Sequence, residues 1–351
     1  MKEVAIKDIC HKDSSALKQK ELLSEGKYPV FGASGIAGYL NTFYQEKEYI
    51  GIVKDGSGIG RVAFYPAESS LIGTMQYILP KEDYDIRYIG YCLQSLDLSK
   101  YKQGAAIPHI YFRDYGEQLV KVTDHWEEQH SIVSRLDSAF SHLDALKANA
   151  EKQLNEARKL FQAELTECMR PKEGWEEKTL PKLSENLDSI RKPVTKKDRT
   201  EGFYPYYGAS GIVDYVDNYL FDEDLLCISE DGANLLMRTY PIAFPISGKA
   251  WVNNHAHVLR FKCMSTQRYV EYYFAGLKLD AYITGAAQPK LTQKALNSII
   301  ISIPSSLAEQ SSIVSHLNSL SSNIRKLEEL QQKTLAECDA LKQAMLREVF
   351  E

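Results

Sequence analysis

The sequence predicts an α+β protein with two similar domains, each followed by a long helix. Three observations predict this arrangement. The chain has 351 residues, enough for about two domains that each bury a core. A short motif occurs twice, which indicates a duplication. Two stretches, 126–169 and 306–351, contain neither glycine nor proline, as expected of long helices.

The duplication is visible in the order of its motifs. The segment Tyr28–Ile36 (YPVFGASGI) returns 176 residues later as Tyr204–Ile212 (YPYYGASGI). Further matches follow in the same order, at offsets of 176 and then 181 residues: Asp55-Gly56 with Asp231-Gly232, Gly104–Pro108 with Gly285–Pro289, and Glu128-Gln129 with Glu309-Gln310. Small insertions in surface loops explain the drift, and the period is too long for a solenoid. We therefore expect two homologous halves related by a pseudo-twofold duplication.

Residues 1–125 and 170–305 are the predicted globular domains. Their apolar runs are short, rich in Tyr, Ile, Val and Phe, and separated by turn residues. Such runs are typical of strands. Each domain is therefore predicted to be mixed, with mainly β structure.

The stretches 126–169 and 306–351 are the predicted spacer helices. Apolar residues recur in them at three- and four-residue spacing, which predicts a seam for a coiled coil. The predicted seam contains Leu136, Leu143, Leu146 and Leu160 in the first helix and Leu317, Ile324, Leu327 and Leu341 in the second. Because a globular domain separates the helices, we expect an antiparallel pair about 60 Å long. The alternative is that each helix lies on its own domain.

Composition excludes several classes of protein. No run approaches the ~20 apolar residues that a membrane helix needs, and the first residues lack the apolar core of a signal peptide. The six cysteines form no C-x-x-C pair, so we expect the reducing cytoplasm rather than a disulfide framework. The net charge of -5 argues against indiscriminate binding of polyanions but allows a local basic face.

No catalytic motif is present in the sequence. The glycine-rich segment Asp55–Arg61 lacks the G-K-[ST] of a phosphate-binding loop and fits a turn better. Phe31–Gly35 superficially resembles the F-x-G-x-G loop of methyltransferases, but its glycines are wrongly spaced and no [ND]-P-P-[FY] motif occurs. We therefore predict no catalytic residue and no cofactor in this chain.

A metal site is not predicted either. His255, His257 and Cys263 lie close in sequence, but their spacing is a weak signal for zinc. The first half carries Met75 and Tyr77 at the positions we match to the two histidines. We expect these histidines to be structural.

Basic and polar residues suggest contacts with nucleic acid. Segment 190–199 carries Arg191, Lys192, Lys196, Lys197 and Arg199 against one acidic residue, which suits contacts with phosphates. The alternative is a solvated loop balanced by nearby glutamates. Further candidates for contacts with bases or phosphates are Lys54, Arg61, Lys102 and His109 in the first half, and Arg238, Asn253, Asn254, Lys290 and Thr292 in the second.

Together, these motifs resemble the specificity subunit of type I restriction-modification systems. The resemblance rests on Y-P-x-[FY]-G-A-S-G-I, the strand followed by [KE]-D-G, the G-A-A-x-P turn, and the E-Q that opens each long helix, and it covers essentially the whole chain. The first half departs from the pattern with Ile107 in place of Gln288 and His109 in place of Lys290. It also has Val120–Thr123 where the second half approaches its helix through Ile301–Pro304.

The resemblance implies a non-catalytic subunit that reads DNA. Each globular domain would be a target recognition domain for one half of a bipartite double-stranded sequence, and the antiparallel helices would set the gap between the halves. Two modification subunits, which bind S-adenosylmethionine and methylate adenine, would bind the helices. Restriction subunits that translocate and cleave DNA, with ATP and Mg²⁺, would join the complex. The alternative is a coiled-coil adaptor with duplicated protein-binding domains.

Overall fold

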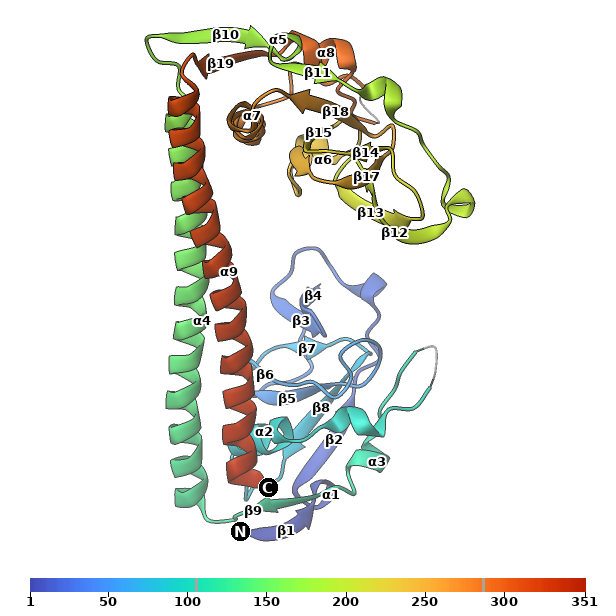
Figure 1. Cartoon of the computed structure of the whole chain (residues 1–351). Helices are drawn as coiled ribbons and strands as arrows, with labels where there is room; N and C mark the ends of the chain where they lie inside the picture. The colour runs from blue at the N-terminus through green and yellow to red at the C-terminus, as the bar shows by residue number, and fades with distance from the viewer. Residues whose placement is uncertain (105–106, 286–287) are drawn as a thin grey trace. The chain divides into compact units, whose positions relative to one another are not determined.

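The computed structural model describes residues 1–104, 107–285 and 288–351 and divides into two compact units (Figure 1). Unit 1 comprises Met1–Glu151 and Leu330–Glu351, and unit 2 comprises Lys152–Glu329. The long helices are α4 (Trp126–Cys168) and α9 (Leu307–Phe350). Each unit therefore contains one globular domain and part of both long helices. The Ala-Ala pairs of the two G-A-A-x-P motifs, 105–106 and 286–287, lie outside the described residues.

Domain 1, the globular part of unit 1, is built on three sheets. Their strand orders are β2-β8-β5-β6, β4-β3-β7 and β1-β9. The strands are β1 (Lys2–Ala5), β2 (Cys10–Ser14), β3 (Tyr28–Gly32), β4 (Gly35–Leu40), β5 (Tyr49–Val53), β6 (Val62–Tyr65), β7 (Ser70–Leu71), β8 (Met75–Pro80) and β9 (Leu119–Val122). Every residue of β5 is buried, because this strand has neighbours on both edges and core on both faces.

Short helices complete domain 1. They are α1 (Ile6–Ile9), α2 (Ile86–Ser95), α3 (Phe112–Tyr115) and the 3₁₀ turns η1 (Gln19–Glu21) and η2 (Leu98–Tyr101). Helix α2 begins where the Asp85 carboxylate accepts a hydrogen bond from the backbone N–H of Tyr88 at 2.9 Å, which satisfies one of the unpaired donors at the helix start. The buried face of α2 then packs into the main core of domain 1.

Domain 2, the globular part of unit 2, repeats the same plan. Its sheets have the orders β11-β18-β15-β16, β13-β12-β17-β14 and β10-β19. The strands are β10 (Trp175–Thr179), β11 (Ser184–Asn186), β12 (Glu201–Gly208), β13 (Gly211–Val216), β14 (Phe221–Asp222), β15 (Leu225–Ser229), β16 (Ala243–Ile246), β17 (Lys249–Val252), β18 (Ala256–Phe261) and β19 (Ile300–Pro304). The helices are α5 (Leu180–Leu183), α6 (Asn234–Met237), α7 (Met264–Gly276), α8 (Gln293–Ser298), η3 (Asp188–Ile190) and η4 (Lys196–Asp198). The predicted duplication of a mixed, mainly β domain is confirmed.

Strand pairing corrects one detail of the alignment between the halves. Met75 pairs with Val53 in domain 1, and Ala256 pairs with Ser229 in domain 2. Val53 and Ser229 are equivalent in the duplication, so Met75 is equivalent to Ala256. The predicted match of Met75 to His255 is wrong by one residue. The same one-residue shift applies to the second predicted match, Tyr77 with His257. Sequence motifs alone could not place an insertion between two strands to within one residue.

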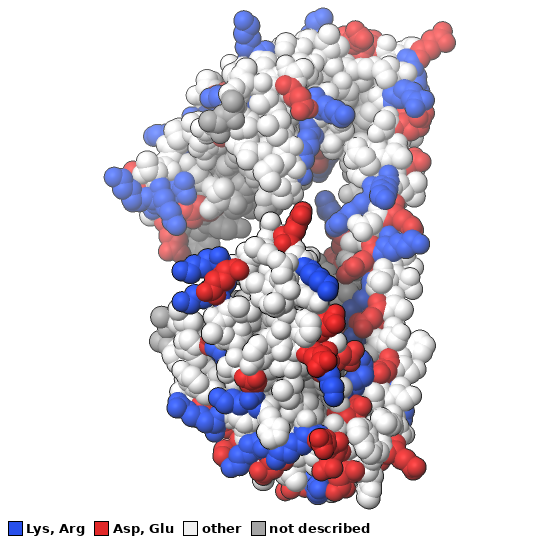
Figure 2. Space-filling view, turned by 180° about the vertical axis from the view of Figure 1, so that it is seen from behind, with Lys and Arg blue, Asp and Glu red and all other residues white. Residues whose placement is uncertain are grey.

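Helices α4 and α9 pack against each other within each unit. The ion pairs between them are Lys147–Asp339 and Lys342–Asp144 in unit 1, and Arg158–Glu328 and Glu164–His316 in unit 2. In both sets the residue number falls along α9 as it rises along α4, so the helices are antiparallel, as predicted. Acidic and basic side chains alternate along the pair (Figure 2). Among the described residues, no helix combines the length and apolar character of a membrane span.

The seam between the helices differs from the predicted one. Leu146 and Leu341 are each 49% exposed, whereas Leu154 and Cys338 are 5% and 3% exposed. Leu160 is 59% exposed but faces α9, because it lines an apolar pocket together with Ile324 and Leu327. The predicted seam assumed a heptad spacing of 3.5 residues per turn, whereas a straight helix has 3.6 and drifts away from such a pattern. The other predicted seam residues are buried or half-buried: Leu136, Leu143, Leu317, Ile324 and Leu327.

A buried glutamine fastens the start of each long helix to its domain. Gln129 is 0% exposed, and its amide donates to the carbonyl of Thr123 at 3.0 Å. Gln310 is 5% exposed and donates to the equivalent carbonyl, that of Pro304, at 2.7 Å. The duplicated Glu-Gln pair therefore has a structural cause, because a buried amide costs free energy unless it is hydrogen-bonded.

The C-terminal turn of α9 belongs to the core of domain 1. Leu346 is 1% exposed and packs in this core, whereas Leu341, five residues earlier on the same helix, is 49% exposed. We expect Leu346→Ala to lower the free energy of unfolding of unit 1 by about 2 to 5 kcal/mol, because it leaves a cavity. Leu341→Ala should change it by no more than about 0.5 kcal/mol. Hydrogen exchange of the β5 amides would measure both effects, and equal effects would contradict this packing.

Candidate nucleic-acid interface

The two duplicated turns lie together in domain 1. Asp55 forms a backbone bridge with His109, and the Gly56 N–H donates to the carbonyl of Pro108 at 2.9 Å. Gln103 and His109 exchange two backbone hydrogen bonds of 2.8 Å, which close the G-A-A-x-P turn. The Asp-Gly turn and the G-A-A-x-P turn therefore form one surface feature, the turn pair of domain 1.

Domain 2 builds the same turn pair from equivalent residues. Asp231 bridges to Lys290, and Gly232 donates to Pro289 at 3.0 Å. Thr284 and Lys290 close the turn as Gln103 and His109 do. The glycine that opens the G-A-A-x-P turn is required by the backbone. Gly285 has a φ of +85°, and a Cβ there would lie 2.5 Å from the carbonyl oxygen of Gln288. Only glycine adopts this backbone without strain.

The charges around the turn pair differ between the domains. In domain 1, Asp55 accepts hydrogen bonds from Lys54 and from Nδ1 of His109, the latter at 2.7 Å. Domain 2 has Glu230 at the position of Lys54, and Glu230 pairs with Lys290 at 3.1 Å. The lysine therefore lies at the end of the strand in domain 1, as Lys54, and at the G-A-A-x-P turn in domain 2, as Lys290.

Behind the turn pair of domain 2 lies a buried network of ion pairs. His257 is 0% exposed; its Nδ1 lies 2.6 Å from Oδ2 of Asp188, and its Nε2 lies 2.8 Å from the carbonyl oxygen of Leu291. The carboxylate of Asp188 and the carbonyl of Leu291 are both acceptors, so each ring nitrogen of His257 faces an acceptor. Arg191 completes the network through Glu230 at 2.6 Å and Asp188 at 3.3 Å.

Two groups of residues in the described part of the chain bring metal-binding atoms within 4.8 Å of one another. One is Asp188, Glu230 and His257. His257 and the guanidinium of Arg191 already contact the carboxylates of this network, and the second ring nitrogen of His257 contacts the carbonyl of Leu291, so the network does not fit a metal. The other group, Glu164, Cys168 and His316, contains ligands that zinc accepts, and two of its members, Glu164 and His316, already pair with each other. Cys263, the third member of the trio considered from the sequence, hydrogen-bonds Ser265 instead.

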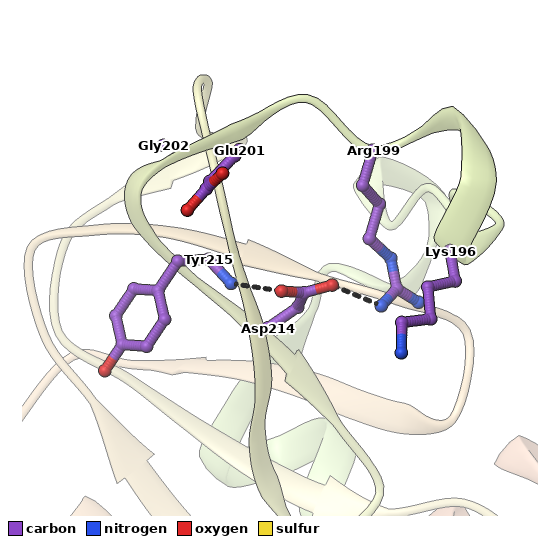
Figure 3. Close-up of a pocket in the computed structure, with 6 residues that line it drawn as sticks. All are labelled: Lys196, Arg199, Glu201, Gly202, Asp214 and Tyr215. Atoms are coloured by element: carbon purple, nitrogen blue, oxygen red, sulfur yellow. Dashed lines mark hydrogen bonds and ion pairs between the residues drawn. The ribbon is translucent and has the colours of Figure 1, made fainter.

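The basic segment runs from this network to a polar pocket. Lys196, Arg199, Glu201, Gly202, Asp214 and Tyr215 line the pocket, which has a volume of about 390 Å³ (Figure 3). Arg199 donates to Asp214 at 2.9 Å and lies over the ring of Tyr206. The hydrogen bond from Arg199 lowers the pKa of Asp214. Lys196 and Lys197 on η4 are exposed, and basic side chains gather at this edge of domain 2 (Figure 2).

Comparison with known proteins shows the family of this chain. Residues 1–156 and 172–337 match the family described as the type I restriction modification DNA specificity domain. The chain belongs to this family. The resemblance inferred from the motifs is therefore confirmed. Membership of this family supports a non-catalytic role in DNA recognition. It does not favour the alternative of a protein-binding adaptor.

Individual relatives agree with the family. A protein of Haemophilus influenzae named as a type I restriction enzyme specificity subunit is 36% identical over 143 residues, which are 41% of this chain and 36% of that protein. The match thus spans about a third of that relative. A chain from a structural study of assembly and conformational transition in a type I R-M system is 15% identical with a TM-score of 0.73, over 99% of this chain and 96% of that chain. The HsdS subunit from Thermoanaerobacter tengcongensis is 15% identical with a TM-score of 0.56, over 99% and 95%. These two structures show the shared fold.

The remaining predicted contact residues of this DNA specificity chain are spread over both domains. Arg61 donates to the carbonyl of Ala33, in the G-A-S-G turn, at 2.8 Å. Lys102 is exposed at the end of η2, and Asn254 is exposed beside the turn pair of domain 2. Lys192 is exposed, and its carbonyl accepts a hydrogen bond from Trp251. Their contacts with DNA remain predictions.

Four predicted contact residues hold domain 2 together. Arg191 lies in the buried network, and Arg238 donates to the carbonyls of Phe274 and Leu277 at the C-terminal end of α7. Asn253 is 6% exposed and accepts from the backbone of His255, while Thr292 caps α8 through the N–H of Ala295. Their side chains are engaged within the domain, so the function proposed below does not rest on them.

One exposed residue was missed in the sequence. Phe203 is 94% exposed, the largest value among the large hydrophobic side chains that the structure describes. The signal was present, because the repeat extends upstream: Glu25–Pro29 reads EGKYP and Glu201–Pro205 reads EGFYP. Comparing the two copies position by position would have shown a lysine exchanged for a phenylalanine.

The buried network predicts how the stability of domain 2 depends on pH. Burial alone would raise the pKa of Asp188, but the hydrogen bond and charge of His257 outweigh it and lower that pKa. Burial likewise opposes ionisation of Glu230, but the hydrogen bond from Arg191 and the charge of His257 lower its pKa. Both carboxylates therefore stabilise the fold above their unfolded pKa values of about 4, and this contribution is lost as the pH falls through the lower, folded values.

We expect Asp188→Asn to reduce the loss of stability of domain 2 between about pH 5 and pH 2, because one of the depressed carboxylates is gone. The variant should also be less stable near neutral pH, where His257 loses its partner. Urea unfolding followed at several pH values would measure this, with the exposed Asp222→Asn as control. An unchanged pH dependence in Asp188→Asn would contradict the charged network.

Proposed function

We propose that this chain is the sequence-reading subunit of a type I restriction-modification complex. Each globular domain reads one half of a bipartite DNA target, and the antiparallel helices set the gap between the halves. The observation that carries this proposal is that one chain contains two DNA specificity domains, each joined to the same pair of helices. A protein-binding adaptor would need no such paired reading domains.

The local charges support DNA as the ligand despite the net charge of -5. Lys290 at the turn pair of domain 2 is 49% exposed and His109 at that of domain 1 is 37% exposed, so both can reach a ligand. The exposed lysines of η4 add a basic edge. Contacts with phosphates position a protein, whereas side chains that reach base edges read the sequence.

The proposal assigns the chemistry to partner subunits. Two modification subunits bind S-adenosylmethionine, methylate adenine and pack on the helices; restriction subunits use ATP and Mg²⁺. These partners add positive charge around the duplex, which offsets the acidity of this chain. The six cysteines are free thiols, which suits the cytoplasm, where such a complex meets DNA.

Sequencing of methylated DNA tests the proposal. The chain is expressed together with a type I modification subunit encoded beside it, and methylated adenines are mapped across the host genome. We expect one bipartite motif with a fixed gap, which disappears when this chain is omitted. Methylation that needs this chain but follows no bipartite motif would refute the proposed function.

The turn pairs predict which half of the motif each domain reads. Lys290→Ala should weaken recognition of one half-site by about 1 to 3 kcal/mol if a base contact is lost, and His109→Ala should do the same for the other half-site only. Binding of the modification complex to duplexes altered in either half would measure this. Lys333→Ala, an exposed change on α9, serves as control. If both variants affected the same half-site, one domain would not correspond to one half.

The spacer role predicts a change of gap. We insert seven residues into α4 after Glu151 and seven into α9 after Glu329, so that the antiparallel pair lengthens while the seam stays in phase. Seven residues add about 10 Å of helix, so the methylated motif should keep both half-sites and gain roughly 3 base pairs between them. Methylome sequencing provides the measurement. Altered half-sites with a constant gap would argue against the spacer.

A further inference from the structure

The exposure of Phe203 results from a β-bulge. The register of β12 and β13 shifts between Glu201 and Tyr204, both of which pair with Val216. Gly202 lies inside this shift, and a Cβ there would approach the carbonyl oxygen of Val216 to 2.2 Å. Residue 202 must therefore be glycine, because its backbone packs against the backbone of β13 with no room for a side chain. The bulge leaves Phe203 unpaired and 94% exposed, in keeping with the role of bulges in redirecting side chains.

Domain 1 carries a different side chain at the equivalent position, just before β3. Gly26 is equivalent to Gly202, and a Cβ on it would lie 3.1 Å from the carbonyl oxygen of Leu40, the residue equivalent to Val216. The next residue is Lys27, which is exposed and lies over the ring of Tyr28 at 4.8 Å. Both copies thus present one side chain from the same place on a hairpin. In domain 1 it is a cation, and in domain 2 it is an aromatic ring.

Lysines lie near Phe203, together with the acidic Glu201 of the same pocket. Lys196 lines the same pocket as Gly202, the neighbour of Phe203 (Figure 3). Lys196 and Lys197 form no ion pair within the described residues, whereas Asp214 in this pocket is neutralised by Arg199. Lys249 lies over the rings of Tyr204 and Tyr219, at 5.8 and 4.7 Å. An exposed aromatic ring on a surface that also carries exposed lysines fits a ligand with phosphates outside and flat apolar faces inside, which describes a nucleic acid.

We propose that Phe203 is a wedge that inserts at a base step of the DNA half-site read by domain 2 and unstacks it, while Lys27 contacts a phosphate at the equivalent place in the other half-site. This inference rests on the proposed function. Apolar side chains that insert between base steps unstack and kink DNA, and they favour flexible steps. Phe203 would then contribute to sequence preference without any hydrogen bond to a base.

Fluorescence of 2-aminopurine tests the wedge in the complete modification complex. The probe replaces single bases in and beside each half-site except the target adenines, because a methyltransferase flips its target base out of the stack. Its emission rises when it is unstacked. Binding of the wild-type complex should raise emission at one position of the domain 2 half-site. Phe203→Ala should abolish this rise and weaken binding about ten- to a hundredfold, whereas Phe203→Leu, which keeps an apolar wedge, should retain most of it.

The duplication supplies matched controls. Phe203→Lys copies domain 1 and should lose the rise in emission while making the salt dependence of binding steeper by about one phosphate contact. Lys27→Ala should make the salt dependence shallower by the same amount and leave the emission unchanged. Because both side chains are exposed, the unfolding midpoints of the variants should match that of the wild type.

The outcomes separate this inference from the proposed function. If the wild-type complex methylates no bipartite motif, the proposed function fails. If it recognises the motif, but Phe203→Ala leaves both emission and affinity unchanged, only the wedge fails. If Phe203→Ala prevents assembly with the modification subunits in the absence of DNA, as seen by size-exclusion chromatography, the ring contacts protein and the wedge is refuted.

Discussion

The burial of two glutamine side chains determines where the long helices leave their domains. Gln129 accepts a hydrogen bond from the backbone of Asp85, and Gln310 accepts one from the hydroxyl of Thr266, in addition to the hydrogen bonds that both donate. A buried amide that lost these partners would cost about 1 to 3 kcal/mol. Neither helix can slide or rotate at its origin without that cost. A spacer needs such fixed origins, because a helix that pivoted at its start would transmit no defined distance.

The two domains share this scaffold but differ in side chains at and near the turn pairs. The turn pairs have the same backbone hydrogen bonds, yet Lys54 in domain 1 is replaced by the buried Glu230 in domain 2, and the exposed Lys27 is replaced by the exposed Phe203. Backbone geometry was thus retained after duplication while side chains at these places changed. This division suits two domains that recognise different sequences, since the scaffold presents the reading side chains and loop residues are free to vary.

Much of the fold could be predicted from the sequence, because the decisive signals were repeated. The duplicated motifs and the glycine-free stretches predicted two similar domains and an antiparallel helix pair. The seam was predicted less well, because Lys147 takes the place expected for Leu146: its stem is largely buried while its ammonium group pairs with Asp339. Arg191 was interpreted as a phosphate contact because its partner Glu230 is 39 residues away and is brought to it only by folding, while Asp188 lies just outside the basic segment. Phe203 was missed because the repeat was followed only from Tyr28 and Tyr204 onward; the extended repeat marks the exchange of Lys27 for Phe203, but the exposure of the ring depends on a bulge that no local sequence pattern indicates.

Lys290 and His109 at the turn pairs are both bound to carboxylates, which bears on specificity. Lys290 pairs with Glu230, and Nδ1 of His109 lies within hydrogen-bond distance of Asp55, so neither side chain is free to bind a passing phosphate. A ligand must replace the carboxylate partner, and only a ligand that supplies well-placed acceptors recovers the interaction that is lost. Non-specific binding gains little from such paired side chains, whereas a correct base edge can replace the lost partner. In a chain with a net charge of -5, DNA contacts of the proposed kind at the turn pairs would favour discrimination between sequences over general affinity for DNA, and the exposed lysines of η4 would supply general attraction to the duplex.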